Sequence, residues 1–148
     1  MTKPLILAGA IALMSALPAA AELMKVPSQK PVAETMDALQ AAVEGAGATV
    51  FARVDHAAGA QQAELELAAS QLLIFGNPKL GTPAMQADMR AGLYLPLKVL
   101  AYEDAEGQVW LTYEDPAGML SGLDIPADAG FIAKMQGALG KLTAAAAQ

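Results

Sequence analysis

The sequence lacks cysteine altogether and contains a single histidine, His56. Without cysteine there is no disulfide framework, no thiolate metal site and no cysteine nucleophile. One histidine also excludes a metal centre built from several imidazoles of one chain. Basic residues are few, since 9 Lys and Arg face 15 Asp and Glu, for a net charge of −6. This balance argues against a nucleic-acid partner, because phosphate binding needs a concentrated basic surface.

Sequence motifs for catalysis are missing as well. There is no Gly-x-Ser-x-Gly elbow and no Walker loop. The acidic turn at residues 103–106 does not follow the residue order of a calcium-binding loop. What the chain does have is apolar surface: 55% of its 148 residues are hydrophobic. That content supports a folded chain, and the length predicts one domain.

The first twenty-one residues have the features of an export signal. Lys3 precedes an uncharged apolar run over residues 5–17, and Ala19 and Ala21 stand at the −3 and −1 positions of a signal peptidase site. The run is shorter than the roughly 20 residues that cross a bilayer comfortably. We therefore expect residues 1–21 to be cleaved and residues 22–148 to form a single periplasmic or extracellular domain with no membrane span. An uncleaved anchor is the alternative.

The first half of that domain shows one clear helix between strands. Residues 22–27 are expected to form an edge strand. A helix should follow Pro31, with one apolar face at the spacing of 4, 3 and 4 residues, and end near Gly45. The members of that face are Val32, Met36, Leu39 and Val43. Residues 49–56 alternate as a half-buried strand that places Val50, Ala52 and Val54 on one side, while residues 57–66 are a weak helix or linker.

The second half predicts more strands and two helices. Residues 71–76 read as a strand covered on both faces, and a helix is expected from Thr82 to Gly92. Residues 95–102 and 109–113 form a hairpin pattern, followed by a loop over 117–127. A last helix should begin at Asp128, with an apolar stripe of Phe131, Met135, Ala138 and Leu142. This order predicts an α+β fold in two layers, a mostly antiparallel sheet with helices packed on one face.

Three ordered blocks resemble a known family. They are VFARVDH at residues 50–56, LIFGNPKLGT at 73–82, and LPLKVL at 95–100 followed by YEDP at 113–116. Together they resemble the domain-of-unknown-function 302 family from about residue 26 to residue 142. The resemblance implies a small two-layer α+β domain of bacteria and archaea that is sometimes exported. It implies no established activity, so no catalytic residue is carried over.

Asp55 and His56 are the most suggestive polar pair. Neighbours on a regular strand point to opposite faces, so Asp55 would not orient His56 there. His56 has the same parity as Val50, Ala52 and Val54, which points its side chain inward. An imidazole there could carry a proton or bind a metal. The simpler interpretation is a hydrogen-bonded histidine that ties the strand end to a loop.

The loop at Asn77 is the first choice for a pocket wall. It follows a strand, and the N–H groups of the next helix could hold an anion with Lys79 nearby. The same residues also serve as simple turn formers, because Asn-Pro stops a strand and Thr-Pro starts a helix. We take Asp55, His56, Asn77 and Lys79 together as the candidate pocket.

Thioether sulfur selects Cu(I), so His56 with methionines is chemically admissible as a copper site. Met85 and Met89, four residues apart on a predicted helix, are expected to face the sheet, and methionines more often fill gaps in a core. No His-Met cluster or Met repeat is present. We therefore assign no metal and no cofactor. The methionines after residue 21 are Met24, Met36, Met85, Met89, Met119 and Met135.

Trp110 has the parity opposite to Val109 and Leu111, which places it on the outer face of its strand. An outward Trp suggests an interface, possible self-association included, whereas packing against a neighbouring strand is the alternative.

Three hypotheses follow. The leading one is an exported, non-enzymatic module that binds a small ligand or a protein. The second is an enzyme with His56 as general acid or base, and the third is a periplasmic copper-binding protein that uses His56 and methionines.

Overall fold

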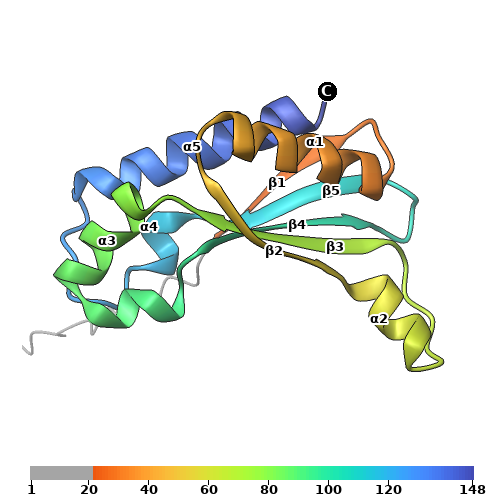
Figure 1. The fold of residues 1–148 in the computed structure, drawn as a ribbon, viewed down its shortest axis with the longest axis horizontal. Coiled ribbons are helices and arrows are strands. Elements are labelled where there is room, and N and C mark those ends of the chain that lie inside the picture. The colour runs from red at the N-terminus through yellow and green to blue at the C-terminus, as the bar shows by residue number, and fades with distance from the viewer. Residues whose placement is uncertain (1–21) are drawn as a thin grey trace, which may run out of the picture.

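The computed structural model describes residues 22–148, so the predicted signal peptide lies outside the described residues. Five antiparallel strands form one sheet in the order β1-β5-β4-β3-β2. The two long helices, α1 and α5, lie side by side on one face of this sheet (Figure 1). The predicted two-layer α+β architecture is therefore confirmed. The strands are β1 (Leu23–Ser28), β2 (Thr49–Asp55), β3 (Ser70–Gly76), β4 (Leu97–Glu103) and β5 (Val109–Glu114). The helices are α1 (Val32–Gly45), α2 (His56–Gln62), α3 (Pro78–Ala87), the 3₁₀ helix η1 (Met89–Leu93), α4 (Pro116–Met119) and α5 (Gly130–Ala146).

The core lies between the two long helices and the sheet. All four predicted apolar positions of α1 are buried, as expected. In α5 the buried stripe is Ile132, Met135, Leu139 and Leu142, so the predicted Phe131 and Ala138 are only half-buried. Both stripes have helical spacing. The observed stripe buries Ile132 and Leu139 where the predicted one would bury Phe131 and Ala138.

Strand β2 contains a β-bulge at Phe51. Val50 pairs with Phe75 and Ala52 pairs with Ile74, so Phe51 is the extra residue. An inserted residue moves every following side chain to the other face. Ala52 and Val54 therefore do not share a face with Val50, and this part of the prediction is wrong.

The face of the sheet away from α1 and α5 carries no helix across its centre (Figure 1). We call it the open face. On β3, Leu73 and Phe75 are buried under the helices, whereas Leu72 and Ile74 on the open face are only half-buried. The prediction that this strand is covered on both faces is therefore wrong, although β3 does lie inside the sheet.

Helix α3 begins four residues before the predicted start. The side chain of Asn77 accepts the N–H of Lys79 at 2.9 Å and caps the helix, with Pro78 at its first position. Thr82 and Pro83 consequently lie inside α3. The sequence holds two adjacent start signals, and the earlier one is used.

The predicted second helix is also divided. Helix α3 ends at Ala87, and Asp88 caps the separate helix η1 by accepting the N–H of Arg90. Asp88 also accepts bonds from the Arg90 guanidinium and from the N–H of Asp124. Met89, expected to face the sheet, is instead 78% exposed. Its exposure follows from this break, which takes Met89 off the axis of α3.

The hairpin of β4 and β5 is confirmed. Its turn places Gly107 at a φ of +81°, a left-handed conformation that glycine adopts without steric cost. The carboxylate of Asp104 accepts the N–H groups of Glu106 and Gln108 and closes the turn. The predicted loop after β5 contains the short helix α4, which Asp115 caps.

Candidate functional site

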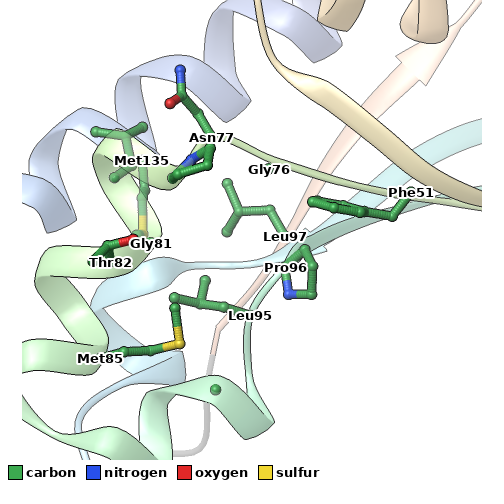
Figure 2. A pocket seen from close by; sticks show the side chains of 13 residues that line it. Phe51, Gly76, Asn77, Gly81, Thr82, Met85, Leu95, Pro96, Leu97 and Met135 are labelled. Carbon is green, nitrogen blue, oxygen red and sulfur yellow. The ribbon is translucent and has the colours of Figure 1, made fainter.

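An apolar pocket of about 350 Å³ lies at one end of the sheet, where β3 passes into α3 and where η1 leads into β4 (Figure 2). Figure 2 shows side chains from four parts of the chain around it. Phe51 comes from the bulge of β2, Met85 from α3, and Met135 from α5. The segment 95–97 forms a further wall.

Glycines leave the space that this pocket occupies. A Cβ atom on Gly76 would stand 3.4 Å from the Pro96 Cβ and 3.5 Å from a ring carbon of Phe51. A Cβ atom on Gly81 would stand 3.8 Å from a methyl group of Leu95. Both glycines line the pocket. Larger side chains at these two positions would therefore narrow it.

The lining carries no titratable side chain. Its only polar side chains are those of Asn77 and Thr82. The side-chain oxygen of Asn77 already accepts the N–H of Lys79 in capping α3, and the carboxamide points away from the pocket in Figure 2. Such a lining favours the burial of apolar groups.

The structure separates the four predicted pocket residues. Asn77 lines the apolar pocket, as the choice of this loop as a wall predicted, whereas Lys79 is exposed and does not line it. Asp55 and His56 lie at the opposite end of the sheet, where β2 meets α2 (Figure 1). His56, Asn77 and Lys79 thus do not converge on one cavity.

His56 is exposed, and its predicted inward orientation is wrong. Asp55 ends the strand because its carboxylate accepts the N–H of Ala58 and caps α2, so His56 is the first residue of a helix. The other oxygen of Asp55 accepts the Gln71 side-chain amide at 3.0 Å. Asp55 and Glu66 also border a shallow, open depression of which His56 is not part. No enclosed acid–base site therefore forms around this histidine.

The methionines are distributed through the fold. Met36, Met119 and Met135 are buried in the core. Met85 lines the pocket at the end remote from His56. Within residues 22–148 no three His, Cys, Asp or Glu side chains are grouped as metal ligands.

Trp110 lies on the open face, as its parity predicted, and is half-buried. Its indole N–H donates to the Asp104 carboxylate at 2.7 Å, which lowers the pKa of Asp104. The Lys25 ammonium stands 5.4 Å from the Trp110 ring centroid and 5.6 Å from that of Tyr102. The neighbouring Tyr102 side chain raises the pKa of Lys25. Trp110 thus contacts the neighbouring strand β1 through Lys25, and its role at an interface stays a prediction.

Sequence reasoning missed most of the pocket wall. The alternation of residues 49–56 predicts a regular strand at Phe51, and the helical spacing directs Met85 to the sheet, whereas both side chains line the pocket. Gly76 and Gly81, on either side of Asn77, are the sequence signal that points to this pocket. Glycine beside apolar residues can mark a close approach of two segments. The bulge that directs Phe51 to the pocket has no clear sequence mark.

Comparisons with known proteins give a family and a fold. The family model described as "Domain of unknown function DUF302" matches residues 24–148. A solved structure, the uncharacterized conserved protein DUF302 from Bacillus stearothermophilus, aligns with a TM-score of 0.76 over 85% of this chain and 98% of that chain. Its sequence identity is 17%, so the likeness concerns the fold alone.

Curated relatives share a higher identity over a shorter length. Fluoride-specific ion channel FluC 1 of Brucella suis biovar 1 (strain 1330) is 50% identical over 95 residues, which cover 64% of this chain and 37% of that protein. Fluoride-specific ion channel FluC 1 of Brucella abortus biovar 1 (strain 9-941) is 50% identical over 95 residues, or 35% of its length. The matched stretch thus spans little more than a third of these relatives. Within residues 22–148, no helix of this chain has the length and apolar character needed to cross a bilayer.

Proposed function

Because the chain belongs to the DUF302 family, whose description assigns no activity, we propose a function from its pocket: an exported, non-enzymatic module that binds a small apolar ligand. The observation that carries this proposal is the pocket at the end of the sheet, which has an uncharged lining and about 350 Å³ of space. Small-molecule sites typically have volumes of roughly 300–1,000 Å³ and mostly apolar walls. The absence of titratable side chains from the lining favours binding over catalysis.

The size of the pocket limits its ligand. A water molecule, which has one non-hydrogen atom, occupies roughly 30 Å³ of the liquid. At this volume per atom, the pocket holds on the order of ten non-hydrogen atoms of a ligand. A medium-length alkyl chain or a single aromatic ring fits this limit. Each buried CH₂ group contributes about 0.8 kcal/mol, so an eight-carbon chain should bind detectably.

The test is calorimetric titration of residues 22–148 with octan-1-ol. We expect saturable binding to the wild type and a loss of at least about tenfold in affinity for Gly81→Leu, because the new side chain fills the pocket. Gly137→Leu is the matched control, since Gly137 is in helix α5 with nothing within 4 Å of an added Cβ. If Gly81→Leu does not fold, Gly81→Ala makes a smaller intrusion at the same place. Absence of binding to the wild type, or equal binding by both leucine variants, contradicts the proposal.

The relatives favour a second candidate, in which the chain acts beside a fluoride-specific ion channel. In the Brucella proteins a stretch similar to this chain belongs to the same polypeptide as a longer remainder. Segments joined in one polypeptide often act together. The pathway across the membrane would then belong to the channel.

This candidate is tested by deleting the gene and measuring growth in graded fluoride. The expected result is a fluoride tolerance at least about twofold lower, restored by a plasmid copy. Unchanged tolerance speaks against a role with the channel and leaves the apolar-ligand proposal to its own titration.

A further inference from the structure

Lys98 carries a positive charge at the edge of the wall formed by segment 95–97, although it is not itself one of the residues that line the pocket. It follows the pocket-lining segment 95–97 and pairs with Ile74 in the register of β3 and β4, on the open face. Its ammonium group donates to the carbonyl oxygen of Tyr94 at 3.0 Å. The Tyr94 carbonyl group is bonded to the lining residue Leu95, so the ammonium group reaches back to the backbone of the pocket wall.

This ammonium group retains capacity for a ligand. It has three N–H donors, of which the structure assigns one, to a neutral carbonyl. Among residues 22–148, the ion pairs are Arg53 with Asp37 and Arg90 with Asp88, so no described carboxylate neutralises Lys98. The side chain is half-buried, which reduces the competition from water for an anion bound there.

We propose that the ligand is a medium-chain or aromatic carboxylate, with its apolar body in the pocket and its carboxylate on Lys98. The inference rests on the proposed function and specifies its ligand class. The pocket supplies the uncharged part of the complementarity, and the Lys98 ammonium group supplies the charged part.

A carboxylate fits this edge better than a phosphate. Phosphate sites usually combine several N–H donors, often from a helix N-terminus. Here the first N–H groups of α3 are already bonded: that of Lys79 to the Asn77 side chain, and those of Leu80 and Gly81 to the Asn77 carbonyl. One ammonium group with two remaining donors matches the two oxygens of a carboxylate.

The experiment compares octanoate with octan-1-ol, which share a chain and differ in charge, at pH 7 by calorimetry. We expect the wild type to bind octanoate about tenfold more tightly, because a hydrogen bond to a charged group contributes more than one between neutral groups. Lys98→Met keeps the length of the stem and removes the charge, so it should abolish this preference. Lys79→Met is the matched control: it removes the charge of an exposed lysine of α3, whereas Lys98 is half-buried, and it should keep the preference.

The outcomes separate the two proposals. Equal wild-type affinity for both probes, or an octanoate preference that survives Lys98→Met, overturns the role of Lys98 while the apolar-ligand function stands. Binding of neither probe overturns both. If Lys98→Met does not fold, Lys98→Gln provides a second neutral variant, for which the same loss is expected.

Discussion

At the scale of single residues, Phe51 shows how one inserted position creates a site. As the extra residue of the β2 bulge it has no partner on β3, and its side chain turns to the rim of the pocket. Bulges commonly redirect a side chain next to a binding site. The ring is 59% exposed, so it contributes more to the pocket than to the core.

We expect Phe51→Ala to separate binding from stability. The free energy of unfolding should change by less than about 1 kcal/mol, as for other exposed positions. Octan-1-ol affinity should fall several-fold, because the ring forms part of the rim. Phe75→Ala is the contrast: Phe75 is buried, and its loss should destabilise the fold by about 3–5 kcal/mol. Denaturant unfolding and calorimetry measure the two effects, and a large destabilisation by Phe51→Ala would contradict this division.

Asp88 connects three backbone segments and gives a prediction for pH. Hydrogen bonds from Arg90 and from the N–H of Asp124 lower the pKa of Asp88 well below its ordinary value of about 3.9. A lowered pKa in the folded state means that the carboxylate stabilises the fold fully above the unfolded pKa. This contribution is lost as the pH falls through the folded pKa.

Asp88→Asn should therefore lower the Tm at pH 7, and its difference from the wild type should shrink as the pH is brought from 4 to 2. Thermal unfolding followed by circular dichroism measures both. Asp128→Asn, at an exposed position, is the control and should show little change at either pH. A Tm difference that stays constant down to pH 2 would exclude the charge of Asp88 as the cause.

At the scale of elements, hydrophobic periodicity predicted which residues pack against the core. It failed to predict the end of an element where a single local hydrogen bond sets that end. Helix α1 and the β4–β5 hairpin were predicted correctly because many residues repeat the same signal. The start of α3 depends on which of two adjacent caps is used, and the end of β2 depends on one carboxylate, that of Asp55. The pocket was only partly predictable for the same reason: Asn77 had a sequence signal, whereas Phe51 and segment 95–97 reach it through the bulge and the tertiary fold.

Glycines in helices give a prediction at this scale. Gly137→Ala should raise the free energy of unfolding by about 0.5–1 kcal/mol, because its position in α5 is exposed and has room for a methyl group. Gly81→Ala in α3 should give a comparable gain in helix stability, together with weaker binding of octan-1-ol. Urea unfolding and calorimetry of both variants test this. A Gly81→Ala variant that binds as tightly as the wild type would show that this glycine does not limit the pocket.

At the scale of the whole molecule, the fold keeps two kinds of surface apart. The apolar pocket lies at one end of the sheet, and the polar Asp55 and His56 lie at the other (Figure 1). We propose that this molecule works outside the cytoplasm, since its first residues have the features of a cleaved signal.

The expected mature protein begins at Glu22. N-terminal sequencing or intact-mass measurement on protein from a periplasmic or culture fraction should give this end, and Ala21→Pro should impair cleavage. Recovery of the full-length chain from the membrane fraction would instead indicate a permanent anchor.

Met135 belongs both to the buried core and to the pocket wall. A guest molecule in the cavity would press directly on helix α5, the last long segment of the chain. Occupancy should therefore slow the exchange of amide hydrogens with deuterium along that helix, well beyond the residues that touch the guest. The protein would then signal an occupied state through the rigidity of its C-terminal end.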